Sequence, residues 1–341
     1  MFGLLLKQDI AIDLGTANTV IMVDGEVVID EPSIVAIDQT KNRVIAVGQE
    51  ALYMHEKAHK NIRTVRPLRG GVIADFAMAE AMIRGFLDKI PGSRRLLKPN
   101  LRLMVCIPSG ITEVEERAVR DSAERAGARE VYLIHEPMAA ALGMDLDVEA
   151  PEGNMVIDIG GGTTEIAVIT LGGIVCDRSI RIAGDELNAD IVEYIRRQHN
   201  LQIGERTAER IKIEVGAAMT DIPDPPPNQP VRGKDVMTGT PRTLTISYRE
   251  IVSALDKSIS KILEAVMQTL GATPPEIAAD LVERGIHMAG GGALLRGLDK
   301  RIAQQTNLPV RIAEDPLRAI AKGTSYALRN LNKFHFLLVK S

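Results

Sequence analysis

Residues 9–23 read Asp-Ile-Ala-Ile-Asp-Leu-Gly-Thr-Ala-Asn-Thr-Val-Ile-Met-Val, and residues 154–168 read Asn-Met-Val-Ile-Asp-Ile-Gly-Gly-Gly-Thr-Thr-Glu-Ile-Ala-Val. The second stretch lies almost half the chain further on, with Asp158 in the place of Asp13. Both stretches are typical of a buried strand, a turn rich in Gly and Thr, and a second strand. A supersecondary unit that recurs in this way predicts two similarly folded lobes.

Helix signals lie between and after these two units. Residues 112–115 and 247–250 form capping boxes, which predict helices that end near Ala126 and Gly271. Helices mixed with strands on this scale predict an α/β fold with layered sheets.

Composition limits the classes of function. The 341 residues are enough for two domains, and their formal net charge of −4 provides no general basic surface. Aromatic residues make up 3% of the chain and Trp is absent, so a base-stacking platform is not expected. Nucleic acid is therefore not an expected partner.

Cysteine usage and hydropathy predict a cytoplasmic protein. Cys106 and Cys176 lie in apolar runs, which favours reduced core residues over a disulfide. No run reaches the ~18 apolar residues that a transmembrane helix needs. The first seven residues lack the basic start and cleavage site of a signal peptide. We expect a cytoplasmic location that still permits contact with a membrane surface.

The two Gly/Thr turns carry the first candidate site. Each follows an aspartate at the end of a buried strand, Asp13 or Asp158, and neither fits a P-loop or dinucleotide-binding motif. Glycines let backbone N–H groups approach phosphate oxygens, and carboxylates can hold the water ligands of Mg²⁺. One aspartate before a turn is also typical of simple turn capping. Its recurrence in matched contexts favours a phosphate and metal site.

Two further segments are each open to two interpretations. Residues 290–295, Gly-Gly-Gly-Ala-Leu-Leu, are typical either of a tight strand-to-helix turn or of a bare backbone against a nucleotide. Glu136 precedes Pro137, so it falls at the start of a helix. Its carboxylate either interacts favourably with the helix dipole or orients the water that attacks a γ-phosphate.

The ordered set of motifs resembles the actin/heat-shock-chaperone/sugar-kinase ATPase superfamily, and within it the MreB family of bacterial actins. The resemblance covers nearly the whole chain. Its motifs are residues 12–19, 71–76, 108–110, 136–141, 156–165, 207–212, 290–295 and 313–317.

This resemblance implies an actin-like ATPase fold of two duplicated α/β lobes, each with a mixed sheet and helices, and a nucleotide in the cleft between them. Lobe I is expected over residues 1–145, with its core at 1–31 and 66–145, a small subdomain at about 32–65, and a C-terminal helix at about 315–341 packing back on it. Lobe II is expected over residues 146–314, with its core at 146–181 and 245–314 and a small subdomain at about 182–244.

The resemblance also implies residues that bind ATP and Mg²⁺ and hydrolyse ATP to ADP and phosphate. The phosphates are expected at Gly15, Thr16, Ala17, Asn18, Gly160, Gly161 and Gly162. The nucleoside is expected between Glu209, Arg210, Ile211, Lys212 and Gly290, Gly291, Gly292, Ala293. Asp13 and Asp158 would hold Mg²⁺ through water, and Glu136 and Thr163 would be the catalytic residues that place the attacking water. His135 and Ala289 depart from the usual family pattern without removing an expected ligand.

The function implied is an ATP-dependent, filament-forming bacterial actin that directs cell-wall synthesis and rod shape. Its expected partners are further copies of itself, the inner face of the cytoplasmic membrane and cell-wall elongation proteins. Membrane contact is expected at Phe2, Leu4, Leu5, Leu96 and Leu97, because these apolar side chains lie beside cations. Core packing of Leu96 and Leu97 is the alternative. The apolar run 334–339 is expected to pack on lobe I, touch lipid or mediate other contacts, and the sequence does not choose among these.

A small-molecule kinase of the same superfamily and a chaperone-type ATPase are the alternative functions. A kinase normally needs a carboxylate base for a substrate hydroxyl, and the sequence offers no candidate beyond Glu136. A chaperone-type ATPase would carry a peptide-binding domain after the ATPase region, and only a short stretch follows the last nucleotide motif here. We therefore expect the filament-forming ATPase.

Overall fold

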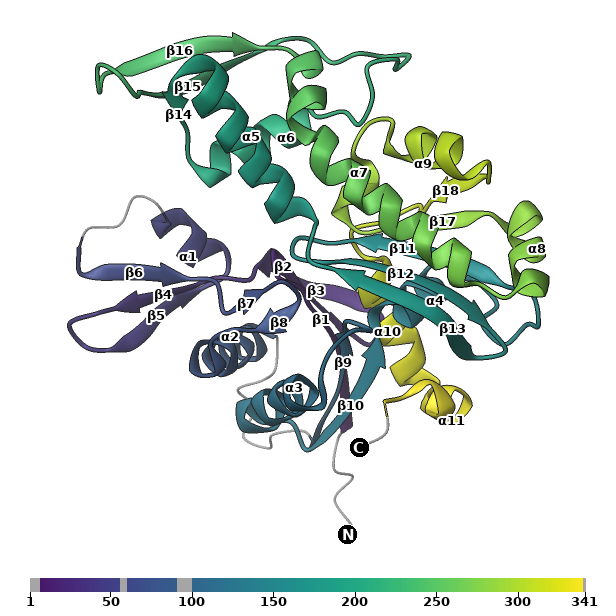
Figure 1. Ribbon diagram of the computed structural model, residues 1–341. Coiled ribbons are helices and arrows are strands. Elements are labelled where there is room, and N and C mark those ends of the chain that lie inside the picture. The colour runs from purple at the N-terminus through teal and green to yellow at the C-terminus, as the bar shows by residue number, and fades with distance from the viewer. Residues whose placement is uncertain (1–6, 56–59, 91–99, 340–341) are drawn as a thin grey trace.

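The computed structural model describes residues 7–55, 60–90 and 100–339. It has two lobes, each built around a five-stranded mixed sheet (Figure 1). The predicted membrane residues lie outside the described residues. They are Phe2, Leu4, Leu5, Leu96 and Leu97.

The sheet of the first lobe has the strand order β10-β9-β1-β2-β3. Strands β1, β2 and β3 are antiparallel neighbours, whereas β9 and β10 run parallel to β1. The bounds are β1 Lys7–Leu14, β2 Asn18–Val23, β3 Glu26–Pro32, β9 Asn100–Ile107 and β10 Glu130–His135. The buried central strands β1 and β9 are rich in Ile, Leu and Val, as expected of strands covered on both faces.

The sheet of the second lobe repeats this topology. Its order is β13-β12-β11-β17-β18, with β11, β12 and β13 antiparallel and with β17 and β18 parallel to β11. The bounds are β11 Asn154–Ile159, β12 Thr164–Thr170, β13 Gly173–Ile180, β17 Ile286–Ala289 and β18 Val310–Ile312. The repeated sequence unit thus forms β1–β2 in one lobe and β11–β12 in the other.

Smaller sheets and the helices complete the two lobes. The small sheets are β5-β4-β6 (β4 Val35–Asp38, β5 Arg43–Val47, β6 Ile62–Val65), β14-β15-β16 (β14 Leu201–Gln202, β15 Gln229–Asp235, β16 Pro241–Ile246) and β7-β8 (β7 Leu68–Arg69, β8 Val72–Ile73). The helices are α1 Gln49–Met54, α2 Phe76–Lys89, α3 Glu113–Ala126, α4 Glu136–Gly143, α5 Gly184–His199, α6 Glu205–Val215, α7 Tyr248–Ala272, α8 Pro275–Arg284, α9 Leu298–Thr306, α10 Ala319–Arg329 and α11 Leu331–Phe334, with 3-10 turns η1 Gly291–Leu294 and η2 His335–Leu337.

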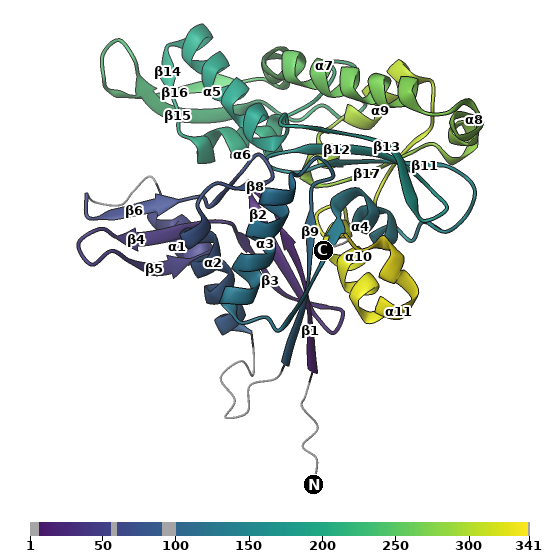
Figure 2. The same cartoon turned by 60° about the horizontal axis from the view of Figure 1, so that its bottom comes forward.

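Helices α4 and α10 lie between the two large sheets, and other helices cover the outer faces (Figure 2). Apolar residues of α2 and α3 pack on the outer face of the first sheet, and those of α5 and α7 pack on the second. A separate apolar cluster joins both sheets through the central helix pair, and it includes Met104, Ala139, Val156 and Ala327. The two lobes are therefore joined by a packed apolar core.

The capping boxes form as predicted. Thr112 and Glu115 exchange reciprocal hydrogen bonds at the start of α3, and Gly127 ends this helix with a φ of 119°. Ser247 and Glu250 do the same at the start of α7, which ends one residue beyond the predicted position.

The C-terminal segment differs from the single helix expected at about 315–341. It is divided into α10, α11 and η2, because the backbone leaves the helical conformation at Asn330. The apolar end packs on the first lobe, where the Val339 N–H donates to the Leu133 carbonyl at 3.0 Å. Phe334 and Leu337 are buried, whereas Phe336 is exposed.

Glycines fix how closely α4 and α10 cross. A methyl group added at Gly323 would overlap the carbonyl oxygen of Ala139, and one added at Gly143 would overlap that of Ala319. The two backbones are therefore in direct contact, and any larger residue must force the helices apart.

We predict that Gly323→Ala destabilises the protein by about 2–3 kcal/mol, because overpacking at a backbone contact cannot relax cheaply. Gly271→Ala is the matched control, since nothing lies within 4 Å of a methyl group there. It should be neutral or stabilise by about 0.5–1 kcal/mol through helix propensity. Urea unfolding of both variants measures the difference, and equal effects would contradict the tight crossing.

Candidate functional site

The repeated turns of the two lobes are in direct contact. A methyl group added at Gly161 would lie 2.6 Å from Ala17 Cβ, and one added at Gly162 would overlap the Thr16 hydroxyl. The phosphate positions predicted in the first lobe therefore lie against those predicted in the second. Only glycine permits this approach.

Three buried carboxylates, Glu136, Asp158 and Glu165, and the partly exposed Asp13 lie next to these turns, and desolvation raises the pKa of each. The pKa of Asp13 rises to about 6 because of burial, although a hydrogen bond from the Cys106 thiol at 3.3 Å opposes the rise. Burial also holds the pKa of Asp158 well above its ordinary value, and the charge of Asp13 adds to this effect. The pKa values of Glu136 and Glu165 are raised in the same way. The site thus gathers four carboxyl groups whose ionisation their surroundings disfavour.

This arrangement fits a hydrated magnesium ion. Asp158 Oδ1 is buried and has no hydrogen-bond partner, so it is an acceptor that a ligand could satisfy. Among the described residues, no group of three or more His, Cys, Asp or Glu side chains could hold a metal ion directly. Mg²⁺ usually keeps several waters and takes few protein ligands. Asp13 and Asp158 are suited to bind such waters.

The Gly-rich segment at residue 290 joins this site from the second lobe. Gly290 has a φ of 78°, and a methyl group there would overlap Ile159 O and lie 2.6 Å from Asp158 Oδ1. Gly291, Gly292 and Ala293 continue into η1. This segment therefore lies directly behind the second phosphate turn.

The predicted nucleoside residues of α6 differ in what they can offer a ligand. Lys212 Nζ donates to Gly184 O at 3.0 Å and lies 3.7 Å from Glu209 Oε1. Arg210 is exposed, whereas Ile211 is buried in the core of the second lobe. The side chain of Ile211 thus faces the core, and this packing fixes the position of the neighbouring residues of α6.

Glu136 and Thr163 approach the turns from different elements. Glu136 is buried at the first position of α4, and its pKa is raised by burial and by the charges of Glu165, Asp158 and Asp13. Thr163 is buried before β12, where a methyl group added at Gly71 would lie 2.8 Å from its Cγ2. His135 is partly exposed, with its Nδ1 buried and unpartnered.

Sequence reasoning gave no role to three residues that the structure places here. Glu165 is fully buried on β12, Cys106 hydrogen-bonds Asp13, and Arg66 lies 3.5 Å from Glu205 across the lobes. Only Glu165 had a usable signal, because it is a charged residue within a strand otherwise rich in apolar residues.

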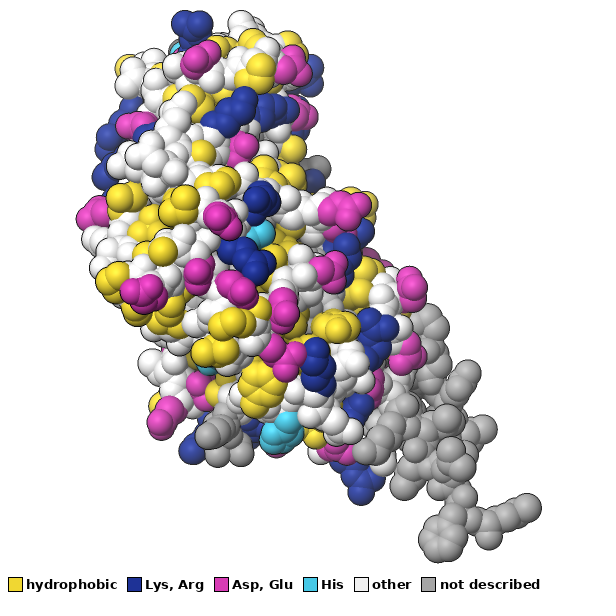
Figure 3. Space-filling model, turned by 90° about the vertical axis from the view of Figure 1, so that its right-hand side faces the viewer, with side chains coloured by type: hydrophobic (Ala, Val, Ile, Leu, Met, Phe, Trp, Pro, Cys, Tyr) yellow, Lys and Arg dark blue, Asp and Glu magenta, His cyan; other side chains and the backbone are white. Residues whose placement is uncertain are grey.

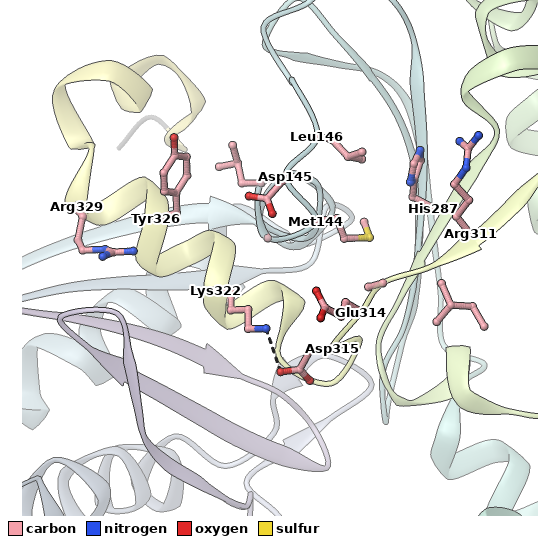
Figure 4. Close-up of a pocket in the computed structure, with 14 residues that line it drawn as sticks. Met144, Asp145, Leu146, His287, Arg311, Glu314, Asp315, Lys322, Tyr326 and Arg329 are labelled. Carbon is pink, nitrogen blue, oxygen red and sulfur yellow. Dashed lines mark ion pairs between the residues drawn. The ribbon is translucent and has the colours of Figure 1, made fainter.

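A pocket of about 500 Å³ lies elsewhere, at the C-terminal end of α4 (Figure 4). None of the predicted site residues lines it. Its lining includes Met144, His287, Arg311, Glu314 and Tyr326, and Lys322 pairs with Asp315 at 3.1 Å.

The face seen in Figure 3 intersperses acidic, basic and apolar side chains. No helix among the described residues is long and apolar enough to cross a membrane.

Comparison with known proteins gives consistent matches over nearly the whole chain. The family model described as MreB/Mbl protein matches residues 7–335. Cell shape-determining protein Mbl of Bacillus subtilis is 46% identical over 330 residues, covering 96% of this chain and 98% of that protein. Cell shape-determining protein MreB of Escherichia coli is 46% identical over 333 residues, covering 96% and 95%.

A solved structure agrees with these matches. MreB5 of Spiroplasma citri bound to AMPPNP has a TM-score of 0.90 and 38% identity, covering 96% of this chain and 97% of that chain. The same protein bound to ADP matches equally well, with a TM-score of 0.90. The predicted actin-like fold is confirmed.

Asp13 predicts a pH dependence of stability in protein freed of metal and nucleotide. Its pKa is about 6 when folded, against an ordinary value of 3.8. The folded state binds this proton more tightly, so the stabilisation is present below about pH 4 and is lost as pH rises through about 6. We expect a loss on the order of 3 kcal/mol, measured by urea unfolding. Asp13→Asn should flatten this part of the profile, whereas Asp224→Asn, on an exposed loop, should not.

Proposed function

The chain belongs to the MreB/Mbl protein family, and we propose that it is an ATP-hydrolysing bacterial actin that assembles into filaments. The filaments lie at the inner face of the cytoplasmic membrane, where they direct cell-wall synthesis and rod shape. Relatives named cell shape-determining proteins support this role, and MreB5 bound to AMPPNP and to ADP supports an adenine nucleotide as ligand.

The observation that carries the proposal is the contact between the two repeated turns beside four carboxylates, of which three are buried. The two glycine-containing turns lie against each other, and backbone N–H groups of such turns are suited to a polyphosphate. The neighbouring negative charge requires a cation, and Mg²⁺ bound by the phosphates neutralises charge there. A simple structural turn would need neither feature.

The catalytic roles follow from position. Gly15, Thr16, Ala17 and Asn18 bind the phosphates from one lobe, and Gly160, Gly161 and Gly162 bind them from the other. Glu136 and Thr163 orient the water that attacks the γ-phosphate. Burial raises the pKa of Glu136 above its ordinary value, which makes its carboxylate a stronger base.

Closure of the lobes links ATP to assembly. Glu136 begins α4, and α4 crosses α10 between the two sheets, so a rotation of the lobes moves the catalytic carboxylate. We propose that bound ATP closes the lobes and favours the assembled form, while hydrolysis loosens it. The four subdomains predicted from the sequence are the bodies that move.

Membrane attachment is proposed at Phe2, Leu4, Leu5, Leu96 and Leu97. The described residues that adjoin both segments are neighbours, because Lys7 pairs with Asn100 where the parallel strands β1 and β9 begin. Arg129 lies at the same edge, with its Nη1 2.7 Å from Asn100 Oδ1. Both segments therefore leave one edge of the first sheet beside a cation that anionic lipid would attract.

We predict that the protein releases phosphate from ATP without an acceptor and pellets in an ATP-dependent manner. Glu136→Ala should slow hydrolysis by about 100-fold, the range expected for a general base, while ATP affinity stays within about threefold. Glu124→Ala, an exposed carboxylate on α3, is the control for loss of charge. Phosphate release and equilibrium nucleotide binding measure the two effects.

Acceptor-dependent ADP formation with no polymer would support the kinase alternative instead. An unchanged turnover rate in Glu136→Ala would remove this residue from its proposed role.

We predict that Leu96→Ser with Leu97→Ser weakens binding to anionic vesicles of phosphatidylglycerol and phosphatidylethanolamine by at least about tenfold, since each inserted leucine is worth about 1.5–3 kcal/mol. Val282→Ser is the matched control, because Val282 is an exposed apolar residue on α8 of the other lobe. Vesicle co-sedimentation measures both. Undiminished binding of the double variant would refute the assignment of this segment.

A further inference from the structure

Glu165 is a buried carboxylate that receives hydrogen bonds from both lobes. The Ser179 hydroxyl, on the neighbouring strand β13, donates to Glu165 Oε1 at 2.6 Å. Ser109, in the loop that follows β9 of the first lobe, donates to Oε2 through its hydroxyl at 2.8 Å and its N–H at 3.1 Å. One carboxylate oxygen therefore accepts a hydrogen bond from within the second lobe, and the other accepts two hydrogen bonds from the first lobe.

The backbones of the two lobes approach closely around this contact. A methyl group added at Gly110 would lie 2.9 Å from Ser179 Cβ. One added at Gly71 would lie 2.8 Å from Thr163 Cγ2 and 3.0 Å from Pro108 Cγ. Residues 108–110 of the first lobe thus fit against β12 and β13 of the second, and we call this contact the interlobe seam.

The seam lies next to the proposed site of hydrolysis. Glu165 follows Thr163 by two residues and pairs with Asp158 across β11 and β12. Its charge is also the largest electrostatic influence on Glu136. A movement of Glu165 in the seam therefore shifts Thr163 through the two-residue backbone link. It also changes the electrostatic effect of the Glu165 carboxylate on Glu136.

We propose that Ser109 and Glu165 are positioning residues that lock the closed lobes together and set Thr163 against Glu136. The inference rests on the proposed ATP hydrolysis, and it assigns a role to the Pro108-Ser109-Gly110 motif. When the lobes separate, Ser109 leaves Glu165 and a buried carboxylate oxygen loses both of its donors. That oxygen must then be hydrated or re-bonded, which makes the closed seam a distinct state instead of one point in a continuous motion.

The chain provides a matched pair of serines for the test. Ser109→Ala and Ser179→Ala each remove one hydroxyl donor to the same carboxylate, but only Ser109→Ala weakens the link between lobes. We expect Ser109→Ala to lower kcat about tenfold with ATP affinity changed less than about twofold. Ser179→Ala should lower kcat less than threefold, and Ser109→Thr, which keeps the hydroxyl, should retain activity within about threefold of the unmodified protein. Thermal unfolding of each variant checks that it is folded.

Two further measurements separate positioning from a general structural effect. Glu165→Gln combined with Ser109→Ala should be no slower than Glu165→Gln alone, because the two residues act as a pair. Hydrogen exchange at the peptide containing Ser109 should be slower with Mg²⁺ and AMPPNP than without nucleotide, since its amide N–H donates to Glu165 in the closed seam.

Each outcome bears on a different claim. If Ser109→Ala lowers kcat no more than Ser179→Ala does, the positioning role is overturned while ATP hydrolysis stands. The same conclusion follows if hydrogen exchange at Ser109 is equally fast with and without Mg²⁺ and AMPPNP. If the unmodified protein neither binds nor hydrolyses ATP, the proposed function is overturned and the positioning role with it.

Discussion

The gathering of four carboxyl groups at the junction of the lobes, three of them buried, is the constraint on which the rest of the structure depends. Buried charges of like sign oppose one another and oppose folding, so the surrounding fold must compensate for them. It does so with two large sheets of identical topology. In each sheet an aspartate, Asp13 or Asp158, lies one residue before the end of a buried strand. The duplicated architecture thus brings two similar acidic turns to one place, and neither turn could form this site alone.

The central helix pair explains how that site can respond to a ligand. Helices α4 and α10 touch through glycines, and α4 carries Glu136 at its first turn. The loop before α10 also contacts the nucleoside segment, because the Gly290 N–H donates to Pro316 O at 2.9 Å. Movement between the lobes would therefore reach both Glu136, the proposed catalytic carboxylate, and the segment at Gly290 through these helices.

Much of the fold could be predicted because its signals are local. The capping boxes at Thr112 and Ser247 and the repeated Asp13 and Asp158 units are all readable within short windows. The contact between Ser109 and Glu165 joins residues 56 positions apart, and nothing in either neighbourhood indicates the other. The break at Asn330 was missed for a different reason: the residues after it pair with β10, and this tertiary contact outweighs their helical preference.

The pairing of Lys7 with Asn100 has a consequence for how the molecule meets a surface. Under the proposed membrane attachment, Lys7 and Asn100 would hold the two attachment points together, because neighbouring strands lie about 4.8 Å apart, and a surface that bound one would meet the other at high effective concentration. Two weak attachments then act as a bivalent one that can still detach. Two points of contact also restrict swivelling about the surface normal, so molecules attached in this way would share an orientation before they meet one another.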